Sequence, residues 1–287
     1  MDILITGILL GGTYALIALG LTLQYGVSRI MNLATGETLV ATALGAFWFF
    51  TSFHLSPIVA ILILAPAAFI INWIIYQVLL TPLVRRAKNR GMLEVDSILA
   101  TFGLLFILQG IMLIVFGGDY LNIDYLAVAY EIMGNPYGLN RIVAFICAVI
   151  IAVILYIILY RTRFGTAIRA VAVDPVSAGL VAIDVNKTTA FAFALGAAVT
   201  ACGGALLSMF LTFNASIGVI FTMKALIIVI MGGVGDIRGA VIAAVILGIA
   251  ETLVATLLDP GLTLAATYIL FILTLLLRPQ GLFGRST

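Results

Sequence analysis

The run 139-LNRIVAFICAVIIAVILYIILYRTR-163 decides the class of fold, because between Arg141 and Arg161 it contains no charged residue. About 20 apolar residues in a helix cross the hydrocarbon core of a bilayer, and this run is long enough to do so. The rest of the chain has the same character, since 64% of its 287 residues are hydrophobic and only 9% are charged. A soluble domain could not bury so much apolar surface. We therefore expect an all-α polytopic membrane protein.

Similar apolar stretches recur on both sides of this run. About eight of them meet or nearly meet the length needed for a span. They start at Ile3, Thr38, Pro57, Ser97, Leu139, Thr188, Gly239 and Leu262. A shorter run, 217-IGVIFTMKALIIVIMGG-233, is interrupted by Lys224 and predicts a short or broken membrane helix. No loop is long enough to hold a second domain, so residues 1–287 are expected to form a single transmembrane domain.

The distribution of charge predicts the orientation in the membrane. When the predicted spans are threaded alternately, 12 of the 14 Lys and Arg residues fall on one side, and Arg141 is the exception on the other. Basic residues are retained on the cytoplasmic side of a membrane. The N-terminus is therefore predicted to be periplasmic and the C-terminus cytoplasmic.

Several classes of protein are excluded by what the sequence lacks. It has no GxxxxGK[ST] phosphate-binding loop, and its single histidine rules out an HExxH zinc site. We expect no enzyme activity, no bound metal and no cofactor in this chain. Only Glu37, Lys224 and Glu251 are ionisable and lie in or near apolar segments. Such residues usually line the path of a driven solute, and three are too few for the chain to power transport alone.

These intramembrane charges leave alternatives open. Lys224 either extends toward the outer membrane interface or meets a solute. Glu251 lies about 18 Å along its helix from Gly239, deep enough to need a polar partner on a neighbouring span. Glu37 either lines a pathway or is a carboxylate in the first turn of a helix, where the helix dipole stabilises it.

A polar interruption, 165-GTAIRAVAVDPVSAGLVAIDVNK-187, follows the span that begins at Leu139. Asp174 suits a helix N-cap and Pro175 suits the first helical position, so a short helix is expected from Pro175 to about Ala182. About eight residues give roughly 12 Å of helix, less than half of a bilayer. The segment is either a connector that reverses the chain or a docking helix for a cytosolic partner.

Four ordered stretches resemble one family, the bacterial branched-chain amino-acid-type ABC importer permeases. They are 20-GLTLQYGVSRIMNLATGE-37, the run from Arg169 to Val185, 231-MGGVGDIRGAVIAAVILGIAETL-253 and 278-RPQGLFGR-285. In that family a cytoplasmic coupling loop, here about 161–187, inserts into a cleft on the ATP-hydrolysing subunit. The resemblance implies that the ATPase-coupling residues are Arg169, Ala170, Asp174, Pro175, Ala178, Gly179, Leu180, Ile183 and Asp184.

Three residues depart from the pattern of this family. Val173 stands where the family often has Glu, and Ala182 where it usually has Gly. The loss of that glycine weakens a left-handed helix end. Thr35 replaces a frequent His. The first two changes affect the details of docking, and the third affects substrate preference.

Two segments combine glycine, polar residues and an interruption of helix, one in each half of the chain. Transporters commonly build central sites from broken helices whose free N–H groups attract anionic groups of a solute. Together with the lysine of the short run, these segments give the predicted substrate pathway of Asn32, Thr35, Gly36, Glu37, Lys224, Gly232, Gly233 and Gly235. Both segments would also suit ordinary cytoplasmic turns.

Together with the resemblance, these features predict a permease subunit of an ATP-driven importer for small polar solutes, above all branched-chain or other amino acids or related amides and carboxylates. The resemblance implies a second, non-identical permease, two cytosolic ATP-binding subunits that hold ATP and Mg, and a periplasmic solute-binding protein. It places the chain in the bacterial inner membrane, in contact with lipid and not with nucleic acid. The alternatives are an autonomous secondary transporter or channel, and a purely structural membrane subunit.

Overall fold

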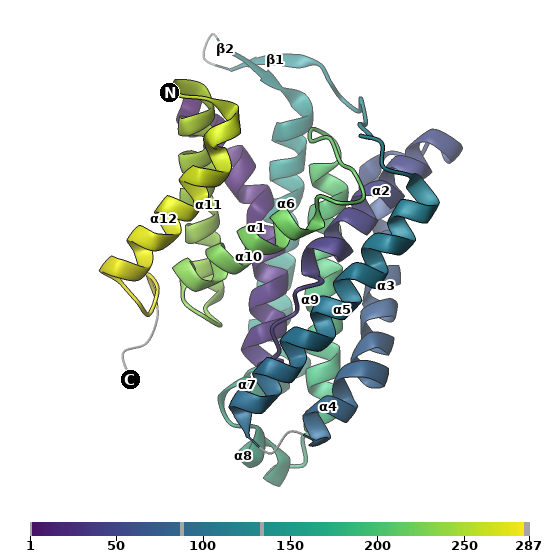
Figure 1. Ribbon diagram of the computed structural model, residues 1–287, viewed down its shortest axis with the longest axis vertical. Helices are drawn as coiled ribbons and strands as arrows, with labels where there is room; N and C mark the ends of the chain where they lie inside the picture. Colours follow the sequence, from purple (N-terminus) through teal and green to yellow (C-terminus); the bar gives the residue numbers. More distant parts are fainter. Residues whose placement is uncertain (1, 87–88, 133–134, 284–287) are drawn as a thin grey trace.

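The computed structural model describes residues 2–86, 89–132 and 135–283, and it is almost entirely helical (Figure 1). The α-helices in these residues are α1 (Asp2–Ser28), α2 (Thr35–Phe53), α3 (Pro57–Ile75), α4 (Thr81–Arg86), α5 (Arg90–Phe116), α6 (Leu139–Arg161), α7 (Arg163–Val173), α8 (Pro175–Leu180), α9 (Val185–Leu207), α10 (Gly218–Gly232), α11 (Ile237–Leu257) and α12 (Thr263–Leu277). A π-helical turn, Tyr76–Leu80, joins α3 to α4, and a 3-10 turn, Pro260–Leu262, leads into α12.

Seven helices in the described ranges are long and apolar enough to cross a membrane, with α3, the π-helical turn and α4 forming one of them. They correspond to seven of the eight predicted spans. The eighth, which was predicted to start at Thr38, lies in the 19-residue helix α2 but is not among the seven. Glu37 and several threonines lower the hydropathy of α2. The predicted short membrane helix is α10, which has 15 residues.

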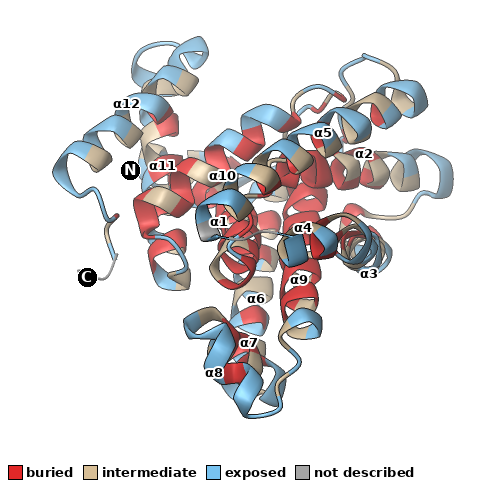
Figure 2. Cartoon of the chain, turned by 60° about the horizontal axis from the view of Figure 1, so that its bottom comes forward, coloured by how far each residue is buried: buried red, intermediate tan, exposed pale blue. Residues whose placement is uncertain are grey.

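The core lies where α1 and α9 run side by side through the middle of the bundle (Figure 2). Residues of α1 are buried along most of its length, and α11 packs against another face of the same helix. Glycine makes the close packing of α11 on α1 possible, because a Cβ added at Gly248 of α11 would lie 2.5 Å from the Cα of Gly11 on α1. Backbones approach this closely in membrane helices only where side chains are small. In contrast, α3, α5 and α12 expose many large apolar side chains, as expected for lipid-facing helices.

A two-stranded hairpin, β1 (Ala129–Ile132) and β2 (Asn135–Gly138), stands at the opposite end of the body from α8 (Figure 1). It contacts the start of α1, because Asp2 Oδ1 accepts hydrogen bonds from Asn135 Nδ2 at 2.6 Å and from Tyr137 Oη at 2.9 Å. The sequence predicted helices only and not this hairpin, since strands of four residues are too short to show an alternating pattern.

The last of the four motifs packs back onto the bundle. A turn follows α12, and the backbone N–H groups of Leu282 and Phe283 donate to the carbonyl oxygens of Met231, at 2.7 Å, and Gly232, at 3.1 Å. These carbonyls belong to the last turn of α10, which has no helical partners for them. Gly284 and Arg285, the end of the same motif, lie outside the described residues.

Candidate functional site

The segment between α1 and α2 is a buried break in the helical path rather than an exposed turn. Ile30, Asn32 and Thr35 are each at most 1% exposed, and Glu37 is fully buried. Figure 1 shows α2 starting in the middle of the body instead of at its end. Non-helical backbone at such depth is tolerated only where protein or a watery cavity satisfies its polar groups. The segment is therefore not an exposed turn, and the pathway role of its residues stays a prediction.

Three side chains from other elements satisfy the polar groups of this break. Gln24 of α1 accepts a hydrogen bond from Asn32 Nδ2 at 3.0 Å and donates through Nε2 to the Phe193 carbonyl of α9 at 3.1 Å. Thr101 of α5 accepts from the Leu33 N–H at 3.2 Å and donates to the Met31 carbonyl at 2.9 Å.

The third side chain belongs to α10. Thr222 Oγ1 donates to the Leu33 carbonyl at 3.0 Å and accepts from the Gly36 N–H at 2.9 Å. The roles of Thr101 and Thr222 were not predicted, because a threonine in an apolar helix carries no signal of a partner far away in the chain. The break is thus held in one conformation by α1, α5 and α10.

The first turns of α2 and α10 lie against each other. A Cβ added at Gly36 would lie 2.5 Å from Thr222 Oγ1 and would also collide with the Gly218 carbonyl oxygen. The Glu37 carboxylate packs against Gly218, the first residue of α10, where the helix dipole favours negative charge. Neither oxygen of this carboxylate has a hydrogen-bond partner among the described residues.

The glycine-rich segment after α10 is a turn, as its composition predicted. Gly233 has φ of 102° and Gly235 has φ of 84°, conformations that favour glycine over any other residue. Gly232 packs against the backbone of Gly239 in α11. The helix α10 therefore connects the two predicted parts of the pathway, since it begins beside Gly36 and ends at Gly232.

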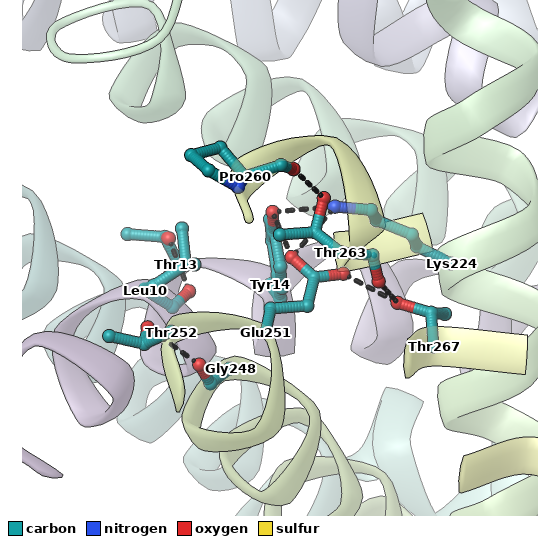
Figure 3. A network of polar contacts seen from close by, with 10 residues as sticks. All are labelled: Leu10, Thr13, Tyr14, Lys224, Gly248, Glu251, Thr252, Pro260, Thr263 and Thr267. Atoms are coloured by element: carbon teal, nitrogen blue, oxygen red, sulfur yellow. Dashed lines mark hydrogen bonds and ion pairs between the residues drawn. The ribbon is translucent and has the colours of Figure 1, made fainter. Parts of the chain in front are cut away.

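Lys224, on α10, pairs with Glu251 of α11 inside the bundle (Figure 3). Its Nζ lies 2.8 Å from Glu251 Oε2 and 2.9 Å from Tyr14 Oη, and the Tyr14 hydroxyl lies 3.1 Å from the same carboxylate oxygen. The other oxygen of Glu251 accepts from Thr267 Oγ1 at 2.8 Å. Lys224 is 8% exposed and Glu251 is 3% exposed.

The contacts of this ion pair test two of the predictions made for the intramembrane charges, one for Glu251 and one for Lys224. The prediction that Glu251 needs a polar partner on a neighbouring span is confirmed, with partners on α1, α10 and α12. Extension of Lys224 toward the outer interface is wrong, because its ammonium group faces a buried carboxylate. Sequence reasoning missed Tyr14 and Thr267, which are separated from Glu251 by 237 and 16 residues.

A cavity of about 440 Å³ lies beside this ion pair, and both charged residues line it. Most of the remaining wall is apolar, with Leu10 of α1 and Ile220 and Phe221 of α10 among its residues. Arg141, at the start of α6, also lines the cavity, and its guanidinium carbon lies 5.8 Å from the centre of the Phe210 ring. No group of three or more His, Cys, Asp or Glu side chains in the described part of the chain could hold a metal ion.

The predicted coupling segment forms α7 and α8 and protrudes at one end of the molecule (Figure 2). Asp174 caps α8 as predicted, since its Oδ1 accepts from the N–H groups of Val176 at 2.9 Å and Ser177 at 3.2 Å. Pro175 occupies the first position of this helix. The helix ends at Leu180, two residues earlier than expected.

The side chains of α8 divide into a packed face and an exposed one. Val176 is 77% exposed and Leu180 is 84% exposed, whereas Ala178 is buried and Ile183 is partly buried against the same cluster. Nothing lies within 4 Å of a Cβ added at Gly179. The apolar side chains of this segment are therefore divided: Val176 and Leu180 point to the outside, and Ile183 anchors the end of the loop.

The two flanks of α8 are fixed by polar groups. Before it, the Arg169 guanidinium lies over the Tyr160 ring, 4.9 Å from its centre, and Ala170 accepts the Asp174 N–H at 3.0 Å. After it, Asp184 caps α9 by accepting from the Lys187 N–H at 3.1 Å. This backbone hydrogen bond holds the pKa of Asp184 below its ordinary value. The loop thus has a defined shape even though most of it is exposed.

Ala182 has φ of 62°, so an alanine occupies the left-handed position where the family usually has glycine. The N–H groups of Ala182 and Ile183 donate to the carbonyls of Gly179 and Ala178, both at 3.2 Å, which is the pattern of a Schellman end. A left-handed residue other than glycine costs roughly 1–2 kcal/mol.

Ala182→Gly is therefore expected to stabilise the loop by about 1 kcal/mol and to slow hydrogen exchange of the two amides about fivefold. Ala167→Gly, in the interior of α7, is the matched control and should speed exchange in its own helix, because glycine weakens a helix interior. Faster exchange at residues 182–183 in Ala182→Gly would contradict the left-handed assignment.

The fold and the site define a polytopic membrane protein with buried polar breaks, which is the construction of a transporter. The family model described as "Branched-chain amino acid transport system / permease component" matches residues 3–277. The chain belongs to this family. The expectation of a permease without enzymatic activity is therefore confirmed, and the chain is one component of a transport system.

Curated relatives are similar to this chain over nearly its full length. The Escherichia coli K12 high-affinity branched-chain amino acid transport system permease protein LivH is 31% identical, covering 97% of this chain and 94% of LivH. The Pseudomonas aeruginosa protein BraD, described in the same words, is 29% identical over 98% of this chain and 95% of BraD. A probable LivH permease of Methanocaldococcus jannaschii is 27% identical over 94% of this chain. No solved structure shows a significant match.

Proposed function

We propose that the chain is the inner-membrane permease of an importer for branched-chain amino acids, and that cytosolic ATPase subunits drive it through α8. The observation that carries the proposal is the exposed apolar pair Val176 and Leu180 on a capped, protruding helix. Neighbouring apolar side chains that are exposed together outside a membrane commonly mark a contact with a partner protein. The names of the relatives support the same class of solute.

The coupling segment at about 161–187 is suited to transmit force. Asp174 and Asp184 fix the starts of α8 and α9, and Ile183 and Ala178 join the loop to the cluster that packs around α1, α6 and α9. A displacement of α8 therefore moves packed helices and not a loose connector. ATP binding by the partner subunits would favour one arrangement of these helices over the other.

The pathway residues lie on or next to α10. Asn32, Thr35, Gly36 and Glu37 meet its first turns, Lys224 is in its middle, and Gly232, Gly233 and Gly235 form its end. Rocking of this short helix would open and close the route for the solute. Glu37, a buried carboxylate without a hydrogen-bond partner in the described residues, is suited to a site that changes its contacts during transport.

The proposed transport needs partner proteins that bind ATP, complete the membrane part and deliver the solute. ATP and Mg belong to two cytosolic ATP-binding subunits, and this chain binds no cofactor of its own. A second, non-identical permease completes the membrane part, and a periplasmic binding protein delivers the solute. The N-terminus lies on the periplasmic side and α8 on the cytoplasmic side. An autonomous secondary transporter or channel would instead move solute without ATPase subunits.

Leu180→Glu is expected to weaken binding of the ATPase subunits by about 2 kcal/mol, or roughly thirtyfold in Kd, because it puts a charge in an apolar contact. Co-purification from native membranes and ATP-driven leucine uptake in proteoliposomes measure this effect. Leu258→Glu is the matched control: Leu258 is 70% exposed and follows α11 at the other end of the molecule.

The expected result is loss of both readouts in Leu180→Glu and retention of both in Leu258→Glu. Uptake by the permease alone, driven by an ion gradient without any ATPase, would overturn the proposal and favour the secondary transporter.

A further inference from the structure

We infer that the cavity beside Lys224 and Glu251 is a binding site for the zwitterion of an apolar amino acid, with the lysine taking the carboxylate and the glutamate taking the ammonium group. The inference rests on the proposed function and names the place where the solute is held. Its evidence is a buried pair of opposite charges, an apolar wall and a basic residue at the same cavity.

The ion pair is not explained by stability alone. Two charges taken from water into a bundle of apolar helices are costly, and well-packed apolar side chains of similar size usually stabilise a fold at least as well. Ionisable residues inside a membrane protein are rare and commonly mark a solute path. Here both members of the pair line one cavity, instead of lying at a closed contact between helices.

The hydrogen bonds of the pair suit an exchange of partners. The ammonium group of Lys224 has three donors, and the described contacts use two of them, to Glu251 and Tyr14. Glu251 keeps the Tyr14 hydroxyl and Thr267 when the lysine is drawn away. A zwitterion placed beside the pair meets one charge of each sign, so the net charge of the pair and the solute together stays zero.

The rest of the wall accommodates an apolar side chain. Leu10, Ile220 and Phe221 line the cavity, and its volume of about 440 Å³ lies within the usual range for small-molecule sites. The threonines 252, 256 and 263 add hydroxyl groups without charge. A basic side chain would find no second carboxylate among the cavity residues, because Glu251 is already used by the ammonium group of the solute.

Arg141 gives independent support. It is the one basic residue that the sequence analysis placed on the outer side, against the general distribution of charge. In the structure this exception lines the same cavity, where its guanidinium group lies over Phe210. A cation at this position attracts the carboxylate of a solute that arrives from outside.

The test measures protection of a cysteine in the cavity wall. Cys147 and Cys202, the two native cysteines, are replaced by alanine, and Thr256→Cys is introduced as the reporter. Thr51→Cys is the matched control. Both threonines are exposed and donate to the carbonyl four residues earlier in their helices, but Thr51 is not among the cavity residues. Full-length permease is used with its co-purifying subunits, in lipid nanodiscs for the modification and in proteoliposomes for ATP-driven uptake.

Leucine at ten times its Kd is expected to slow modification of Thr256→Cys by a small maleimide about tenfold, and to leave Thr51→Cys unchanged. Two analogues test the zwitterion: 4-methylpentanoate lacks the ammonium group and 3-methylbutylamine lacks the carboxylate. Neither is expected to protect at the same concentration. Lys224→Met/Glu251→Met should abolish protection by leucine in the Thr256→Cys background.

The inference is overturned if leucine fails to protect Thr256→Cys in a complex that takes up leucine with ATP. That result would leave the proposed function intact. It is also overturned if 4-methylpentanoate protects as well as leucine, because the cavity would then be a general apolar pocket. Protection by leucine alone, in a complex without ATP-driven uptake, would support the site and reject the ATP-driven function.

Discussion

Lys224→Met alone is expected to lower the free energy of unfolding by about 3–5 kcal/mol, which is the typical cost of removing one partner from a buried ion pair. The methionine fills a similar volume, so the effect comes from charge and not from a cavity. It leaves the Glu251 carboxylate buried with only the hydroxyl groups of Tyr14 and Thr267 as partners. Titration with a denaturing detergent, followed by circular dichroism, measures the loss.

The double variant Lys224→Met/Glu251→Met separates charge from packing. It removes both charges together, so we expect most of the lost stability to return, since paired apolar replacements are often neutral or stabilising. The hydroxyls of Tyr14 and Thr267 then lose their common acceptor, which keeps recovery below complete. If the double variant is less stable than the single one, the pair is required for the fold and the charge argument fails.

Gly36→Val is expected to cost about 3 kcal/mol of stability, the upper end of the usual range for overpacking, and to abolish leucine uptake. An added Cβ would lie 2.5 Å from Thr222 Oγ1 and 2.7 Å from the Thr222 backbone nitrogen. The backbone of α10 cannot rotate away as a flexible side chain can. The first turns of α2 and α10 must therefore separate, which breaks the hydrogen bond from the Gly36 N–H to Thr222.

Gly103→Val in α5 is the matched control, because nothing lies within 4 Å of a Cβ added there. It makes the same change in another helix of the bundle and is expected to change the stability of the isolated chain by less than about 1 kcal/mol. Thermal unfolding in detergent and uptake in proteoliposomes are the two measurements. Equal effects of the two substitutions would show that the contact between α2 and α10 has no special importance.

The sequence predicted much of the fold because hydropathy and capping are local properties. Apolar length identified most of the spans, and Asp174-Pro175 identified the start of α8. The π-helical turn at Tyr76–Leu80 and the hairpin after α5 were not predicted, since neither has a local signal of this kind. The break at Asn32–Glu37 was identified by composition, but its burial depends on helices far away in the chain.

The site was harder to predict for a physical reason. The pairing of the buried charged residues depends on how α1, α10, α11 and α12 pack. The residue pattern of a single helix does not contain that information. Glu251 was expected to need a partner, yet nothing in the sequence connected it with Lys224 or Tyr14. The left-handed conformation of Ala182 could not be predicted from local backbone preference, because the packing of Ile183 and Ala178 overrides that preference.

The contact between the end of α10 and the turn after α12 restricts how the molecule can change shape. Leu282 and Phe283 hold the final carbonyls of α10, and Gly232 packs on Gly239 at the same end. This end is therefore the pivot, and a swing of α10 must displace its beginning, at Gly218, by the larger amount. Distance measurements between spin labels would accordingly record the widest change near Gly218 and almost none near Gly232.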